Sequence, residues 1–220
     1  MSKDISALEA KYEAHKIVFG PLYFQAVVTL KRLGILELIA KSRSGITVEQ
    51  ISQQTGVSLY GVKVLTEAAL VIDVLEAIEE EKYKISKIGF FLLKDEMTNV
   101  NLNFMKDVCY LGADRMTESI VNGKPEGLKV LGDWPTLYEG LATFPEPART
   151  SWFNFDHYYS DGAFPSALEI VFKNPPKRLF DIGGNTGKWS MACCNYNTDV
   201  QVTILDLPGQ LAVAQKNVEA

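Results

Sequence analysis

The feature that most constrains this chain lies between residues 179 and 208. An apolar run at 179–182 is followed by a glycine-rich turn at 183–187, and a second apolar run at 202–205 ends at Asp206. Glycine lets the backbone approach a ligand closely, and a helix that begins after such a turn directs free N–H groups at the same place. An acid after the second strand can accept hydrogen bonds from ribose hydroxyls. The pattern predicts half of a nucleotide-binding βαβ unit.

The glycine spacing separates two kinds of nucleotide site. The dinucleotide fingerprint requires glycine at its first, third and sixth positions. Counted from Gly183, these positions hold Gly183, Asn185 and Lys188, so two of the three fail. The spacing that does hold is an acid and two glycines, at Asp181, Gly183 and Gly187. A carboxylate there would repel a pyrophosphate and attract an ammonium group, which disfavours an NAD-type oxidoreductase.

With these residues the chain resembles motifs I and II of the class I S-adenosylmethionine-dependent methyltransferases. The matching segments are Leu179–Gly187 and Ile204–Pro208. The resemblance implies S-adenosyl-L-methionine as cofactor, with Asp181 at its methionyl ammonium, Asp206 at its ribose diol and Leu207 beside its adenine. The remaining cofactor-binding residues that it implies are Gly183, Gly184, Asn185 and Gly187.

Two structural alternatives stay open for this segment. The glycines could form an ordinary strand-to-helix turn that binds nothing. Asp206 could serve as the cap of the helix that follows it.

The first third of the chain carries helix and hairpin signals. Thr47 and Gln50 form a capping box, and Ser58 caps a helix that we expect to run to about Val71. Two strands at 73–78 and 82–86, joined by the glutamates 79–81, complete the pattern. Helix, turn, helix and β-hairpin predict a winged helix.

The segment from Thr29 to Leu93 also resembles the N-terminal dimerisation domain of small-molecule O-methyltransferases of plants and polyketide pathways. The resemblance implies a homodimer formed through the N-terminal helices. We expect one amphipathic helix from Ile5 to Phe19, a break at Gly20–Pro21, and a second helix to about Leu33. The second helix is apolar nearly all round, so it needs cover on most sides. The matching runs are Leu33–Ile39, Ile46–Ile51 and Tyr83–Ser86.

A winged helix raises the alternative of a DNA-binding regulator. The candidate recognition helix carries Lys63 as its basic residue, with Glu67 four positions later. Contacts to phosphate dominate DNA affinity, and a wing tip of three glutamates at 79–81 would repel the backbone. We therefore expect no nucleic-acid partner.

Composition and short patterns argue against a membrane protein, a secreted protein and a metal-binding protein. The chain has 220 residues and a formal net charge of −5. No apolar run approaches the roughly 20 residues that span a bilayer, and no signal-peptide core stands at the N-terminus. Its cysteines, Cys109, Cys193 and Cys194, lack metal-binding spacing. We expect free thiols, no metal site, no membrane contact and a cytoplasmic location.

Aromatic residues are dense in a helix that we expect at 149–172. Trp152, Phe155, Tyr158 and Tyr159 are candidates for the wall of an acceptor pocket, where an aromatic ring could stack. Packing between domains is the competing interpretation of these side chains. No residue is assigned as a catalytic base.

The fold class that we predict is a mainly α winged-helix domain followed by the start of an α/β Rossmann-like methyltransferase domain. The predicted boundaries are 1–98 for dimerisation, 99–176 for a helical acceptor-side region and 177–220 for the cofactor domain. Two strands fall short of the five or so that a doubly wound sheet needs, so we expect a fragment whose base and most of whose acceptor pocket lie beyond residue 220.

The predicted function is S-adenosylmethionine-dependent methyl transfer to an oxygen of a small molecule, for which an aromatic compound is one candidate. The alternative is a non-catalytic dimeric relative that binds the cofactor or acts as a regulator.

Overall fold

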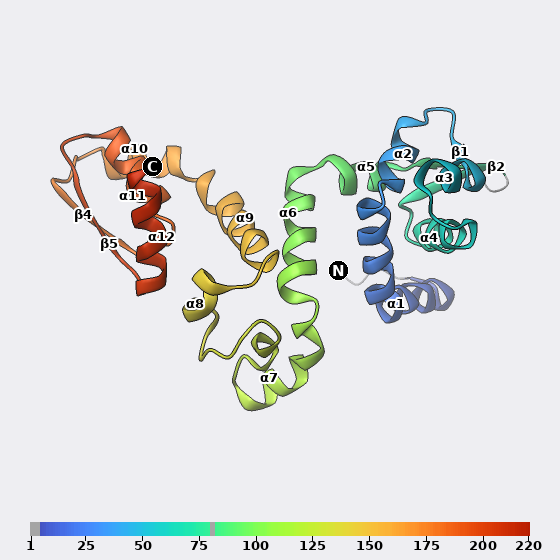
Figure 1. Cartoon of the computed structure of the whole chain (residues 1–220), viewed down its shortest axis with the longest axis horizontal. Helices are drawn as coiled ribbons and strands as arrows, with labels where there is room; N and C mark the ends of the chain where they lie inside the picture. Colours follow the sequence, from blue (N-terminus) through green and yellow to red (C-terminus); the bar gives the residue numbers. More distant parts are fainter. Residues whose placement is uncertain (1–4, 80–81) are drawn as a thin grey trace. The chain divides into compact units, whose positions relative to one another are not determined.

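The computed structural model describes residues 5–79 and 82–220. The chain forms two compact units, Met1–Asn99 and Val100–Ala220, which run from blue to green and from green to red in Figure 1. Within the described ranges, no helix combines the length and the apolar character that a membrane crossing requires.

The first unit is mainly helical and holds one small sheet. Strand β3 lies between β1 and β2 and pairs antiparallel with both. The elements in chain order are α1 (Ala7–Arg32), α2 (Ile35–Lys41), β1 (Ile46–Thr47), α3 (Val48–Thr55), α4 (Leu59–Val71), β2 (Leu75–Glu79), β3 (Lys82–Ile85) and α5 (Lys87–Lys94); α6 (Glu96–Phe104) crosses into the second unit.

Local capping sets the limits of α3 and α4 as the sequence predicted. The Gln50 N–H donates to Thr47 Oγ1 at 3.3 Å, and the Gln50 side chain accepts from the Thr47 N–H at 3.0 Å. The Ser58 hydroxyl accepts from the Gly61 N–H at 3.2 Å. The hairpin strands also form, although Glu80 and Glu81 of the expected wing tip lie outside the described residues.

The expected break at Gly20–Pro21 is wrong, because α1 continues through Pro21 as one helix. Proline removes one backbone hydrogen bond from a helix interior. Contacts along the rest of α1 offset that loss: α1 packs on α2 and α4, and the Tyr12 hydroxyl donates to the Val71 carbonyl at 3.1 Å.

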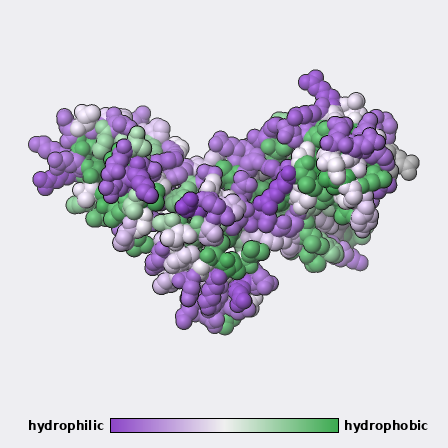
Figure 2. All heavy atoms as spheres, viewed as in Figure 1, coloured by the Kyte–Doolittle hydropathy of each residue, from purple (hydrophilic) through white to green (hydrophobic). Residues whose placement is uncertain are grey.

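The core of the first unit gathers apolar side chains from α1, α2, α3 and α4. Leu30, Leu36 and Val62 are completely buried there. Other apolar side chains of α1 face outward, since Ile17 is 79% exposed and Leu22 is 67% exposed. In Figure 2 hydrophobic atoms gather over α1 at the lower right.

The second unit begins with short helices and ends with two strands and their helices. The expected single helix at 149–172 is wrong, because α9 and α10 are separate. Gly162 is a weak helix former, and Pro165 favours the start of a new helix. After α6 the elements are η1 (Met105–Cys109), η2 (Gly112–Arg115), α7 (Met116–Asn122), η3 (Glu126–Val130), α8 (Leu137–Gly140), η4 (Leu141–Thr143), α9 (Ala148–Asp161), α10 (Phe164–Val171), β4 (Arg178–Ile182), α11 (Lys188–Tyr196), β5 (Gln201–Leu205) and α12 (Pro208–Glu219).

Strands β4 and β5 pair in parallel, with Ile182 opposite Leu205 at their carboxyl ends. Side chains of a strand alternate between its two faces. Leu179 and Val202 pack on buried Cys193 of α11, whereas Phe180 and Ile182 on the other face are exposed. Because the strands end in step, the segments after them leave the sheet at the same edge (Figure 1).

The neighbouring cysteines of α11 differ in environment. Cys193 is buried and Cys194 is exposed. Burial, helped by the negative charge of Asp181 and by Cys194, raises the pKa of the Cys193 thiol to about 11. The pKa of a cysteine in an unfolded chain is about 8.5. Between about pH 8.5 and the folded-state pKa of about 11, the thiol is therefore ionised in the unfolded chain and protonated in the folded chain. This thiol therefore contributes to a fall in stability as the pH rises from about 8.5 to about 11.

We predict that iodoacetamide at about pH 8 alkylates Cys194 and leaves Cys193 unmodified in the folded chain, because the thiolate is the nucleophile. Peptide mass spectrometry measures both sites in one sample. Urea-unfolded protein is the control, in which both cysteines react. Equal modification of the two cysteines in the folded chain would contradict the burial and the raised pKa of Cys193.

Candidate functional site

The turn between β4 and α11 has a backbone that few residue types adopt. Gly183, Asn185 and Gly187 have φ values of 75°, 48° and 79°, a region in which glycine and asparagine are favoured. A Cβ on Gly184 would lie 2.7 Å from Ile204 Cγ2 and 2.8 Å from Asp181 Oδ2. A Cβ on Gly183 would project into open space. The turn thus packs tightly against the sheet below Gly184 and is open above Gly183.

The Asp206 carboxylate accepts hydrogen bonds from two backbone N–H groups, one of them in this turn. Its Oδ2 accepts the Asn185 backbone N–H at 2.7 Å, and its Oδ1 accepts the Leu207 N–H at 2.7 Å. A carboxylate oxygen can accept more than one hydrogen bond, so both oxygens keep capacity for a ligand. The capping alternative for Asp206 does not hold, because the N-cap of α12 is Leu207 and no side chain caps that helix.

Asp181 lies under the turn rather than above it. Its side chain is buried, and its Oδ2 accepts from the Ser190 hydroxyl of α11 at 2.6 Å. Asp181 nevertheless lines a cavity of about 210 Å³ together with Gly183, Gly184 and Asn185. The structure therefore gives Asp181 a bond to Ser190 that the sequence pattern did not indicate.

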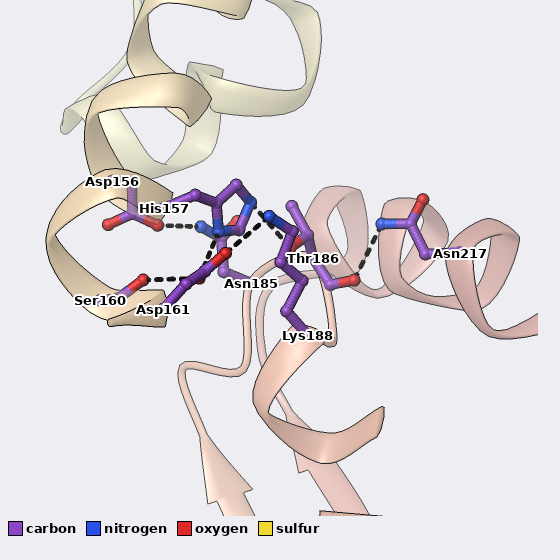
Figure 3. Close-up of polar contacts among 8 residues, drawn as sticks. All are labelled: Asp156, His157, Ser160, Asp161, Asn185, Thr186, Lys188 and Asn217. Atoms are coloured by element: carbon purple, nitrogen blue, oxygen red, sulfur yellow. Dashed lines mark hydrogen bonds and ion pairs between the residues drawn. The ribbon is translucent and has the colours of Figure 1, made fainter. Parts of the chain in front are cut away.

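Helix α9 makes two contacts with the turn (Figure 3). The Asn185 side-chain amide donates to Asp156 Oδ2 at 2.7 Å. The Thr186 hydroxyl and His157 Nε2 are 3.0 Å apart. Asp156 and Thr186 were not among the predicted site residues. No motif or spacing in the sequence indicates that Asp156 contacts Asn185 or that Thr186 contacts His157.

The same network continues to the start of α11. His157 Nδ1 lies 3.2 Å from Asp161 Oδ1, and Lys188 Nζ lies 2.7 Å from Asp161 Oδ2. Burial acts to raise the pKa of Asp161, but the hydrogen bond from Lys188 and the neighbouring His157 outweigh it and hold that pKa below its usual value. Figure 3 also shows Asn217 of α12, which donates to the Thr186 carbonyl at 2.9 Å. Helices α9 and α12 thus both hydrogen-bond to the turn, and Lys188 at the start of α11 bonds to α9 beside it.

The four aromatic candidates for an acceptor wall do not share one environment. Phe155 stacks on Phe104 of α6 with ring centroids 4.0 Å apart. The Tyr159 hydroxyl exchanges hydrogen bonds with the Asn101 side chain, and Tyr158 packs edge-on against Tyr159. Trp152 alone of the four lines a cavity that reaches the turn, which has a volume of about 180 Å³. Packing against α6 accounts for Phe155 and Tyr159. Trp152 also packs on Phe104 of α6, with ring centroids 5.6 Å apart, but lines the cavity as well.

Comparisons with known proteins find a matching domain model and a methyltransferase that is similar in sequence. Residues 11–83 match the family model described as a Dimerisation2-like domain. An L-tyrosine C(3)-methyltransferase of Streptomyces lavendulae is 25% identical over 206 residues, which cover 92% of this chain and 56% of that protein.

Solved structures with this fold include the mitomycin 7-O-methyltransferase MmcR and human N-acetylserotonin methyltransferase in complex with SAM. MmcR has a TM-score of 0.68 at 17% identity, over 96% of this chain and 62% of that one. The human enzyme has a TM-score of 0.63 at 16% identity, over 98% of this chain and 64% of that one. The present chain thus spans somewhat under two thirds of each of these proteins. By this domain match and this sequence similarity, the chain resembles the class I S-adenosylmethionine-dependent methyltransferases of the plant and polyketide type.

Proposed function

We propose that the protein to which this chain belongs is a methyltransferase that binds S-adenosyl-L-methionine over the turn at 183–187. The observation that carries this proposal is the Asp206 carboxylate, which two backbone N–H groups hold at the rim of a turn that is open above Gly183. This arrangement suits a ribose diol, because an oriented carboxylate accepts hydrogen bonds from adjacent hydroxyls. Leu207, which follows on the exposed side, suits a place beside the adenine.

The methionyl end of the cofactor suits the cavity of about 210 Å³ lined by Asp181, Gly183 and Gly184. Two carboxylates, Asp156 and Asp181, line that cavity and would attract an ammonium group, while Lys188, which also lines it, is paired with Asp161. Asn185 and Gly187 keep the turn in its left-handed conformation. The bound cofactor would supply an electrophilic methyl group, and the residues described would bind and orient it.

Methyl transfer demands more positioning than covalent help from the protein. A bound cofactor would supply the methyl group and leave as S-adenosylhomocysteine, while the acceptor hydroxyl would lose its proton. The residues of the turn would contribute by holding the cofactor in line with the acceptor atom, and such positioning supplies most of the rate enhancement. We propose an oxygen of a small aromatic molecule as the acceptor. The ring of Trp152 on α9 lines a cavity beside the turn and would suit an aromatic compound.

We propose that the first unit serves assembly. Its three-stranded sheet and helices α2, α3 and α4 suit a winged helix, and the Dimerisation2-like match covers the same residues. Within the whole chain we keep 1–98, 99–176 and 177–220 as the proposed domains.

We predict that Asp206→Asn weakens binding of S-adenosylhomocysteine by about 10- to 100-fold. The substitution keeps an acceptor oxygen for one of the two backbone N–H groups, places an NH2 donor at the other and removes the charge, and hydrogen bonds to charged groups contribute about 1.5–3 kcal/mol. Calorimetry measures the affinity, with Asp199→Asn in the exposed turn before β5 as the matched control. Equal affinity in Asp206→Asn and the unaltered chain would contradict the assignment of Asp206.

We predict that the chain sediments as a dimer and that a double variant, Ile17→Asp with Leu22→Asp, sediments as a monomer. Both side chains are exposed on α1, and burying a carboxylate in an interface without a partner is costly. Analytical ultracentrifugation measures the mass. Ile120→Asp, on exposed α7 of the other unit, is the control that stays dimeric. A monomeric unaltered chain would refute dimerisation through α1.

We predict that the full-length protein transfers a methyl group from S-adenosylmethionine to the oxygen of a phenol. With methyl-labelled cofactor and a panel of phenols, nuclear magnetic resonance of the product distinguishes an O-methyl from a ring C-methyl group by chemical shift. A C-methylated product would overturn the choice of oxygen while leaving methyl transfer in place. Cofactor binding without turnover of any acceptor would favour the non-catalytic alternative.

A further inference from the structure

His157 is the one histidine of the second unit, and it lines the cavity of about 210 Å³ to which the proposed function assigns the methionyl end of the cofactor. Its side chain is only 17% exposed. Both ring nitrogens have polar neighbours: Nδ1 lies 3.2 Å from Asp161 Oδ1, and Nε2 lies 3.0 Å from Thr186 Oγ1 (Figure 3). The ring is therefore held in one orientation at the wall of the cavity.

The partners of His157 determine which ring nitrogen carries the proton. Despite burial, the hydrogen bond from Lys188 holds the pKa of Asp161 below its usual value, so near neutral pH this carboxylate only accepts hydrogen bonds. Nδ1 is then the donor to Asp161. In the uncharged ring Nε2 has no proton and accepts from the Thr186 hydroxyl. In the charged ring Nε2 carries a proton, and the same hydroxyl turns to accept it. The contact with Thr186 persists in both states, so what changes is the charge.

Most charged groups around His157 are carboxylates. Those of the surrounding elements are Asp156 and Asp161 on α9 itself, Asp181 on β4, Lys188 at the start of α11, Asp206 after β5, and Asp107 of η1, which contacts Ser151 earlier in α9. The cavity itself is lined by Asp156, Asp181 and Lys188. Two carboxylates thus stand against one ammonium group, and the wall carries a net negative charge when His157 is uncharged.

Methyl transfer changes the charge of the ligand that such a wall would meet. S-adenosylmethionine carries a sulfonium, whereas S-adenosylhomocysteine has an uncharged sulfide at the same place. The amino and carboxylate groups of the two molecules are the same. A wall of net negative charge attracts the cationic molecule more strongly than the uncharged one. A positive charge on His157 opposes that attraction.

We propose that His157 sets the selectivity of the site for the sulfonium cofactor over its uncharged product, and that protonation of His157 reduces this selectivity. The inference rests on the proposed function and adds to it a regulation by pH. Histidine is the side chain whose charge ordinarily changes between about pH 5 and 8, so acid weakens the preference for the cofactor. Because both ring nitrogens are already hydrogen-bonded, the role assigned to His157 is selectivity and not proton transfer.

The first experiment is calorimetry on the unaltered chain. The affinities for S-adenosylmethionine and S-adenosylhomocysteine are measured at about pH 7.2 and about pH 5.5, where the amino groups of both ligands are mostly protonated. We expect the affinity for S-adenosylmethionine to fall about three- to tenfold on acidification, as for unit charges several ångströms apart in a protein of intermediate dielectric constant. S-adenosylhomocysteine is expected to keep its affinity within about twofold. Equal changes for the two ligands overturn the proposal.

Two matched variants show which histidine is responsible. The chain has two histidines, and His15 is exposed on α1 of the first unit. His157→Gln keeps a hydrogen-bonding side chain that carries no charge, so we expect its ratio of cofactor to product affinity to be the same at both pH values. His15→Gln is expected to behave like the unaltered chain. A ratio that still changes in His157→Gln, or that stops changing in His15→Gln, overturns the assignment to His157.

A second measurement on the unaltered chain does not depend on whether His157→Gln folds. Binding and protonation are linked, so if protonation weakens cofactor binding, the cofactor must oppose protonation by the same factor. Nuclear magnetic resonance of isotope-labelled histidine follows the His157 ring from about pH 5 to 8, and His15→Gln identifies its signal. The midpoint of this titration is expected about 0.5–1 pH unit lower with S-adenosylmethionine than with S-adenosylhomocysteine. Coincident midpoints, or a lower midpoint with the product, contradict the role of His157.

The outcomes separate this inference from the proposed function. If neither ligand binds the unaltered chain, the proposed function fails and the inference fails with it. If both ligands bind and their affinities respond equally to pH, the methyltransferase proposal stands and the role of His157 in selectivity is overturned.

Discussion

The hydrogen bond from the Asn185 N–H to Asp206 Oδ2 ties the two halves of the site together. It joins the turn after β4 to the residue that ends β5, and the parallel register with Ile182 opposite Leu205 brings these segments to the same edge. The Gly183 N–H donates to the Leu205 carbonyl at 2.8 Å and extends the same link. The left-handed backbone of the turn therefore has support from the neighbouring strand as well as from its glycines.

Asn185 connects this link to the helical part of the second unit. Its backbone N–H bonds to Asp206, its side-chain nitrogen bonds to Asp156 of α9, and its side-chain oxygen is buried without a hydrogen-bond partner. The position of α9 is thus coupled to the position of the turn. Because α9 also packs on α6 through Phe155 and Phe104, contacts run without a break from α6 through α9 to the turn.

Much of the local structure followed from short-range patterns in the sequence. The capping box at Thr47, the cap at Ser58 and the strand that ends before Gly183 are all present, because each depends on bonds among residues a few positions apart. Two expectations failed. Longer-range packing carries α1 through Pro21, whereas the aromatic helix divides at Gly162 because of a local signal, a weak helix former followed by Pro165, that was not taken into account. The implied roles of Asp181, Asp206 and the glycines stay predictions, now with a geometry that suits them.

The sequence by itself determined that a strand, a glycine turn and an acid after a second strand would form, since glycine φ angles and strand periodicity are local properties. Only the tertiary structure decided which side chains meet at the turn. Asn185 and Asp156 are 29 residues apart, and so are Thr186 and His157. Gln210 and Trp152 reach one cavity from two helices. Such contacts depend on how helices pack against the sheet edge, and packing is set by the summed burial of many side chains rather than by any motif.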